Sequence, residues 1–193
     1  MMNCFRKKMK DNSGFTLVEI AIVMVIIGLL IGGVLKGQEM IKNAKIKRVM
    51  KTSDEVRAAI FTYQDRFGYY PGDDPLATTH TGAAVTNGNG NGQVAAAEDE
   101  HVFEHLATVG LISGSAASYA GGTFPSHPFG GRYYLLWQNR NGKTSNWITY
   151  TLVPVDAAIA IDTSLDDGVY TTGSVRASGP YTGTAALTVY VDL

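Results

Sequence analysis

The longest continuous feature of the chain is an apolar run near its N-terminus. Residues 15–35 read FTLVEIAIVMVIIGLLIGGVL and contain a single ionisable side chain, that of Glu19. A helix of this length measures about 30 Å, which matches the hydrocarbon thickness of a bilayer. The helix would be apolar on every face, whereas a helix at the surface of a globular core has one polar face. The pattern therefore predicts a transmembrane helix over residues 15–35.

Beyond residue 35 the helical pattern continues but becomes amphipathic. Gly68 and Pro71 are expected to end it, which predicts a stalk helix over residues 36–67. Its apolar stripe should receive a globular head, and the stripe consists of Ile41, Val49, Thr52, Val56, Ala59, Ile60, Tyr63 and Phe67. On another face lie Ile46, Met50 and Phe61, for which the sequence suggests no partner within the chain. Burial against neighbouring chains and simple exposure both remain open for these three residues.

Residues 68–193 contain several short predicted helices and strands, which indicates a small globular head. A helix is predicted over residues 95–111, with Val102, Phe103, Leu106 and Val109 as its apolar positions. Strands are predicted over residues 132–137, 147–153 and 186–192, with a hairpin turn at residues 139–142 and a short helix at residues 156–165. A long helix packed on a small antiparallel sheet gives an α+β fold.

The net charge of −1 conceals an uneven distribution of charge along the chain. Residues 1–14 hold four bases and one acid, residues 36–66 hold eight bases and four acids, and residues 67–193 hold four bases and eleven acids. Basic residues of the stalk are suited to anionic lipid headgroups or to acidic faces of neighbouring heads. Nucleic acid is not expected as a partner, because the basic stretch has no interleaved aromatic residues. Cys4 is the only cysteine, which excludes an intramolecular disulfide.

The boundary between the basic leader and the apolar run has the features of a processing site. The apolar run exceeds that of a secretory signal peptide, and no small-residue cleavage motif follows it. Gly14 offers an unhindered backbone to a peptidase, and cleavage after it would leave Phe15 with a free amine. An unpaired carboxylate in a membrane helix costs about 3 kcal/mol or more, so Glu19 needs either the N–H groups at its own helix start or a cation from another chain. Exposure of Glu19 at the membrane interface is the simpler alternative.

A basic leader followed by Gly-Phe-Thr-Leu-Val-Glu and an apolar helix resembles the class III signal of type IV pilins and type II secretion pseudopilins. The resemblance implies that a prepilin peptidase removes residues 1–14, that Phe15 is N-methylated, and that Glu19 neutralises the N-terminus of a neighbouring subunit. It further implies an inner-membrane protein with its head outside the cytoplasm. An assembly platform would transfer the subunit into a periplasmic pseudopilus or a cell-surface pilus made of pilin-like subunits. One departure is Lys36, which stands where many pilins have a proline, so a proline-dependent break in the helix is not expected.

The stretch from residue 87 to residue 98 matches the template of a calcium-binding loop. Side-chain oxygens recur at alternate positions, a glycine stands at the sixth position and a carboxylate at the twelfth. The candidate ligands are Asn87, Asn89, Asn91, Gln93 and Glu98. Because Glu98 alone brings charge, we expect binding no tighter than about millimolar. A flexible Asn-Gly linker explains the same composition, and a second acidic cluster at Asp162, Asp166 and Asp167 fits either a separate site or a solvated turn.

The segment from His101 to His105 matches the H-x-x-E-H motif of some zinc peptidases, with Glu104 in place to activate water. His80 or His127 would have to supply a third ligand, and an ordinary helix face explains the match more simply. No nucleophile elbow, phosphate-binding loop or dinucleotide fingerprint occurs, so a structural protein is expected rather than an enzyme. A membrane-anchored ligand-binding module remains the alternative from another class.

Overall fold

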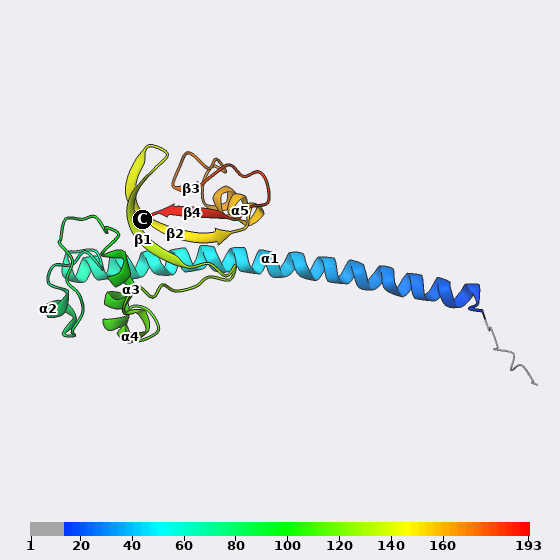
Figure 1. Ribbon diagram of the computed structural model, residues 1–193, viewed down its shortest axis with the longest axis horizontal. Helices are drawn as coiled ribbons and strands as arrows, with labels where there is room; N and C mark the ends of the chain where they lie inside the picture. Colours follow the sequence, from blue (N-terminus) through cyan, green and yellow to red (C-terminus); the bar gives the residue numbers. More distant parts are fainter. Residues whose placement is uncertain (1–13) are drawn as a thin grey trace, which may run out of the picture. The chain divides into compact units, whose positions relative to one another are not determined.

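The structure, a computed structural model, describes residues 14–193, and the chain divides into two compact units after Ile41. The long helix α1, Leu17–Phe67, begins in the first unit and ends in the second (Figure 1). It ends where the sequence predicts: Gly68 takes a left-handed backbone with φ of 81°, and its N–H donates to the carbonyl of Gln64 at 2.7 Å. A glycine in this conformation is a common helix terminator.

The second unit contains a four-stranded antiparallel sheet in the order β1-β2-β4-β3. Its strands are β1 (Tyr133–Arg140), β2 (Lys143–Val153), β3 (Val175–Ala177) and β4 (Leu187–Asp192). The predicted α+β class, with a long helix on a small antiparallel sheet, is confirmed. Asn141 and Gly142 form the tight turn between β1 and β2, with φ of 48° and 87°. Both residues have positive φ, as a type I′ hairpin requires.

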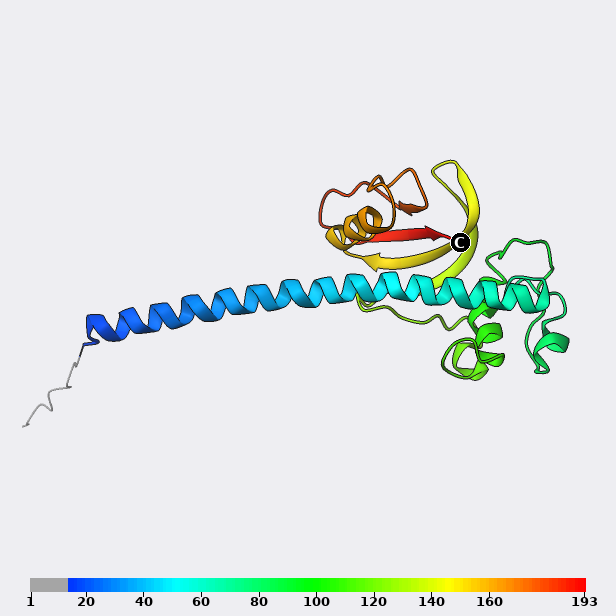
Figure 2. The same cartoon turned by 180° about the vertical axis from the view of Figure 1, so that it is seen from behind.

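One face of this sheet forms the core together with α1 and with α5 (Val155–Leu165). In Figures 1 and 2, β2 and β4 lie between α1 and the β3 segment. Ser53 on α1 donates from its hydroxyl to the hydroxyl of Tyr150 on β2 at 2.7 Å, and both residues are buried.

The core covers a wider arc of α1 than the predicted stripe, but Ile41, which the stripe included, is 61% exposed. Ile46 is 7% exposed and Met50 packs against the core, so the prediction that both lack a partner within the chain is wrong. The reason is that Phe129, on the loop before β1, and α5 join the sheet in this core. Phe61, by contrast, is 42% exposed.

The opposite face of the sheet is a layer of aromatic and cationic side chains. Trp147 and Tyr190 are buried there, because long side chains lie across them. The Arg140 guanidinium lies 4.0 Å from the centre of the Tyr190 ring, and Lys143 and Arg176 lie over Trp147 at 5.6 and 5.7 Å. Such cation–π contacts seal this face without a second helical layer.

Three short helices complete the second unit: α2 (Ala77–Thr81), α3 (Asp99–Thr108) and α4 (Ala116–Tyr119). The helix predicted over residues 95–111 corresponds to α3, and its apolar positions Val102, Phe103 and Leu106 are buried. The short elements α2, α4 and β3 were not predicted, because each has at most five residues and its periodic pattern does not repeat.

Candidate functional site

The first turn of α1 holds the predicted assembly residue Glu19 in a reciprocal hydrogen-bond pair with Thr16. The Thr16 backbone N–H and hydroxyl both donate to Glu19 Oε2 at 2.8 Å. In return, the Glu19 backbone N–H donates to Thr16 Oγ1 at 3.2 Å. This is a capping box, in which the side chains at the start of a helix satisfy N–H groups that have no partner within the helix. The helix start is therefore one of the two partners that the sequence offered for Glu19.

Thr16 is a functional candidate that the sequence reasoning missed. The signal was present, because Thr-x-x-Glu directly before an apolar run is the sequence signature of a capping box. The pairing fixes the Glu19 side chain beside the residue that would become the new N-terminus.

Gly14 and Phe15 precede the first helical residue, in non-helical backbone, and both are exposed. The predicted scissile bond therefore lies at the boundary of α1, and a peptidase could reach it without unwinding the helix. The bases of the predicted leader, Arg6, Lys7, Lys8 and Lys10, lie outside the described residues. Cleavage and methylation themselves remain predictions.

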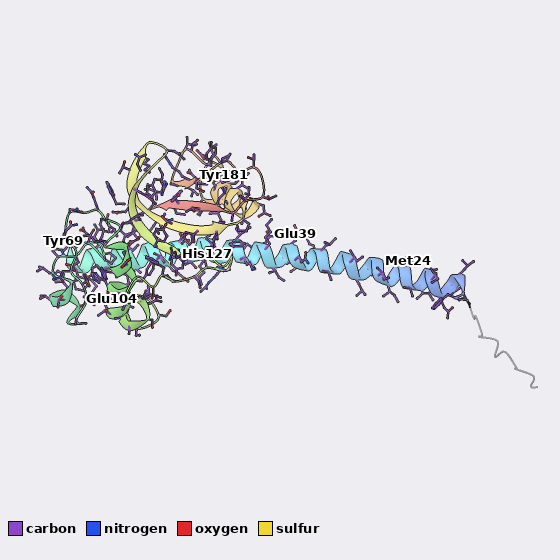
Figure 3. The ribbon with its side chains drawn as sticks, in the orientation of Figure 1. Met24, Glu39, Tyr69, Glu104, His127 and Tyr181 are labelled. Carbon is purple, nitrogen blue, oxygen red and sulfur yellow. The ribbon has the colours of Figure 1, made fainter. Side chains whose placement is uncertain are left out.

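The helix after Glu19 exposes its apolar side chains all round. Ile22 is 55% exposed and Leu35 is 61% exposed, and Met24 projects freely from the helix (Figure 3). The first ion pair of α1 comes directly after the apolar run, where Lys36 and Glu39 lie 2.8 Å apart. By length and composition this helix could cross a membrane.

The predicted calcium loop surrounds a carboxylate from another segment. Asp73 is fully buried, and its oxygens accept the backbone N–H groups of Gly90 at 2.8 Å, Asn91 at 3.0 Å and Gly92 at 2.7 Å. The loop backbone approaches that of Asp73 so closely that residue 88 has to be a glycine, since a Cβ on Gly88 would lie 2.3 Å from the backbone of Asp73. Converging N–H groups of this kind form an anion-binding nest, which is occupied here by the chain's own aspartate.

The candidate calcium ligands make other hydrogen bonds in this structure. Glu98 Oε1 accepts from the side chain of Asn89 at 2.6 Å, and Oε2 accepts from the Ala95 N–H at 2.9 Å. Asn87 Oδ1 accepts from the N–H of Thr78 at 2.9 Å, and Asn91 Oδ1 accepts from the N–H of Gln93 at 2.8 Å. Calcium binding here stays a prediction, and it would require these oxygens to leave their present donors.

The H-x-x-E-H segment lies on α3, where its second histidine is committed to the backbone. His105 is fully buried; its Nδ1 accepts the Gly72 N–H at 3.0 Å and its Nε2 lies 2.8 Å from the carbonyl of Thr86. Burial lowers the pKa of His105, which favours the neutral ring. His101 pairs with Glu104 at 3.1 Å. Because neither nitrogen of His105 is free, the geometry does not fit the zinc-ligand alternative.

The remaining histidines do not supply a third ligand beside this pair. His80 Nδ1 lies 2.7 Å from Asp74 Oδ2, and His127 Nε2 lies 2.7 Å from the carbonyl of Thr151. Both side chains stabilise loops of the head.

The second acidic cluster lies between α5 and β3, and its oxygens lie within 4.8 Å of one another. Asp162 accepts from the hydroxyl of Tyr181 at 2.6 Å, and burial raises its pKa. Asp167 accepts from the hydroxyl of Thr172 at 2.6 Å, and Asp166 accepts from the Val175 N–H at 3.1 Å. These bonds shape the loop that leads into β3, as expected for the turn interpretation.

Comparison with known proteins identifies the N-terminal segment. Residues 9–35 match the family model of the prokaryotic N-terminal methylation motif, whose span includes Gly14, Phe15, Thr16 and Glu19. Neither the comparison with curated proteins nor that with solved structures gave a match. The motif, the capping box and the exposed apolar helix occur together in one segment. This segment therefore carries the prokaryotic N-terminal methylation motif, which supports the resemblance to type IV pilins and pseudopilins.

Proposed function

We propose that the chain is a structural subunit of a type IV pilus or a type II secretion pseudopilus. The observation that carries the proposal is the methylation motif at residues 9–35, continued by a helix whose apolar side chains are exposed. A prepilin peptidase removes residues 1–14 and leaves Phe15 as the N-methylated terminus. Residues 15–35 then form the membrane span, residues 36–67 the stalk and residues 68–193 the head.

The capping box gives Glu19 a way to reside in the membrane before assembly. Thr16 satisfies one carboxylate oxygen, Oε2, while Oε1 has no hydrogen bond within residues 14–193. The cationic terminus of a neighbouring subunit can therefore bind Oε1 without displacing Thr16. When the apolar helix leaves the lipid and packs against neighbouring helices, this pairing requires that the neighbour is staggered along the helix axis.

The subunit is anchored in the inner membrane with its head outside the cytoplasm, until an assembly platform transfers it to the filament. Its partners are other copies and other pilin-like subunits. The head lacks the cysteine pair that closes the C-terminal region of some pilins, since Cys4 is the only cysteine. Pseudopilin, minor pilin and disulfide-free major pilin all agree with this composition.

Mass spectrometry of the mature protein tests the processing step. The expected N-terminus is methylated Phe15; an intact leader, or cleavage beyond residue 35, would refute the proposal. For assembly, Glu19→Ala should be processed normally but absent from filaments. Its matched control is Glu39→Ala, which removes a carboxylate that is already paired with Lys36 on the same helix. Thr16→Val, which keeps the shape and removes the hydroxyl, should assemble more slowly than the wild type, because it loosens Glu19 without removing its charge.

A further inference from the structure

The exposed side of the stalk carries an apolar residue and a carboxylate without a partner. Phe61 is 42% exposed, and it is the large apolar residue within residues 42–67 that the head leaves uncovered. Asp65 lies one turn further along the same side of the helix. Asp54 and Glu55 pair with Arg57 at 3.8 Å and Lys51 at 3.4 Å, whereas Asp65 has no ion pair within residues 14–193.

The head carries the complementary combination. Leu152 is 60% exposed, more than any other large apolar side chain between residues 68 and 193. It lines an open hollow of about 460 Å³ together with Gly130, Gly131 and Arg132.

Arg132 is also the one base of residues 68–193 whose side chain makes no hydrogen bond or ion pair. Lys143 pairs with Asp192, Arg140 donates to Gln138, and Arg176 donates to the carbonyl of Asn141 at 2.9 Å. The Arg132 guanidinium lies over the ring of Phe124 at 5.4 Å and stays exposed to solvent. The head thus places an exposed apolar side chain, Leu152, beside a cation without an ion pair, Arg132. The stalk places the exposed Phe61 beside a carboxylate without an ion pair, Asp65.

The backbone holds Leu152 outward. Leu152 has a left-handed backbone with φ of 56°, at a bulge in β2 between Tyr150 and Val153. His127, labelled in Figure 3, fixes this bulge through its contact with the Thr151 carbonyl at 2.7 Å. A left-handed conformation is costly for a residue other than glycine, and bulges often redirect a side chain toward a function. An apolar side chain held in solvent at this cost is explained by a partner that covers it.

We propose that the Phe61–Asp65 side of the stalk in one copy docks on the Leu152–Arg132 hollow of a second copy. This contact rests on the proposed function and adds to it a specific subunit interface in the filament. Phe61 would enter the hollow beside Leu152, and Asp65 would pair with Arg132. Because the two surfaces differ, each copy contacts one neighbour through its Phe61–Asp65 side and another neighbour through its Leu152–Arg132 hollow. A heterologous contact of this kind propagates into an open helical assembly instead of closing as a dimer.

Disulfide cross-linking in cells tests the contact directly. The test uses the full chain with Cys4→Ser, into which Phe61→Cys and Leu152→Cys are introduced together. Oxidation should give a ladder of multimers, while each single variant should remain monomeric. The matched control combines Phe61→Cys with Leu76→Cys, because Leu76 is also exposed at 50% but lies outside the proposed contact. A ladder from the control that equals the test ladder would overturn the proposal.

Charge exchange tests the ion pair by a second route. Asp65→Arg and Arg132→Asp should each lower filament yield roughly tenfold, since like charges then face each other. The double variant should recover most of the yield. Asp54→Arg is the control for the stalk, because Asp54 is exposed and already has a partner on its own helix. Failure of the double variant to recover, with both single variants folded by circular dichroism, would refute the pairing.

Electron microscopy of the same cells separates the two levels of the proposal. Wild-type filaments without a 61–152 ladder would overturn this contact and leave the proposed function standing. Correctly processed wild-type protein that forms no filament in its native host would overturn the proposed function, and this contact with it.

Discussion

Replacement of Asp73 by alanine should destabilise the head strongly, although Asp73 belongs to no predicted site. The carboxylate is fully buried, and residues 90–92 fold around it through three backbone N–H groups at 2.7–3.0 Å. In Asp73→Ala these donors lose their acceptor, and only water that enters the vacated space can replace it.

The size of the effect follows from the number and kind of these bonds. A hydrogen bond to a charged group contributes about 1.5–3 kcal/mol, and the donors here are only partly buried, which favours the lower value. Three bonds therefore amount to about 4.5 kcal/mol of unfolding free energy. For a unit of about 150 residues, 1 kcal/mol shifts the melting temperature by about 2–4 °C, so the expected decrease is about 9–18 °C.

Thermal and urea unfolding of the full chain in detergent micelles measure this change, with the fluorescence of Trp137 and Trp147 as the signal. The matched control is Asp167→Ala, since Asp167 also accepts two hydrogen bonds but lies at the surface, where water can replace it. The control should lose no more than about 1 kcal/mol. An Asp73→Ala variant as stable as this control would refute the nest as a stabilising feature.

Three further predictions concern the head. Burial raises the pKa of Asp99 to about 6, which is above its value in the unfolded chain. The native state therefore binds the proton more tightly, and the free energy of unfolding falls as the pH rises from about 4 to 6. Asp99→Asn should flatten the dependence of unfolding on pH over that range. Gly131→Ala places a Cβ 1.9 Å from the carbonyl of Thr151 and should lower stability by at least about 2 kcal/mol, whereas Gly179→Ala, with its nearest contact at 3.6 Å, should be nearly neutral in urea unfolding. If the loop binds calcium, millimolar calcium should raise the melting temperature of EDTA-treated protein, and Glu98→Gln should abolish the increase; an unchanged wild type would refute calcium binding.

The sequence was most informative where one short stretch determines the structure. The end of α1 follows from Gly68, and the hairpin follows from Asn141 and Gly142, because positive φ is demanded locally at each point. The class III signal is equally local, which is why the methylation motif at residues 9–35 could be predicted; the role of Glu19 in assembly stays a prediction. Its capping partner Thr16 was also within reach of a local rule.

The sequence was least informative where a residue acts on a distant segment. Asp73 binds backbone atoms seventeen to nineteen positions away, and their N–H groups carry no signal in the sequence. In the Asn-Gly repeat, the alternate side-chain oxygens are visible in the sequence, but the contact of its N–H groups with the Asp73 carboxylate is not; calcium binding by this loop stays a prediction. Ile46 belongs to a core that also contains residues of α5 and against which Phe129 packs, both more than eighty residues later, and the helical periodicity of α1 carries no signal of them.

The glycines of the head and those of α1 differ in whether contacts within the chain explain them. In the head, Gly88 and Gly131 lie so close to other backbone atoms that a Cβ would have no space. In α1, a Cβ added at Gly28, Gly32, Gly33 or Gly37 would meet no atom within 4 Å, so no contact within residues 14–193 explains these four glycines. Each glycine costs a helix about 1 kcal/mol relative to alanine. Their four-residue spacings, Gly28 to Gly32 and Gly33 to Gly37, are those that let two apolar helices approach closely. The helix therefore carries a cost that no contact within residues 14–193 offsets. In the filament proposed above, close contact with the helices of other subunits would offset it.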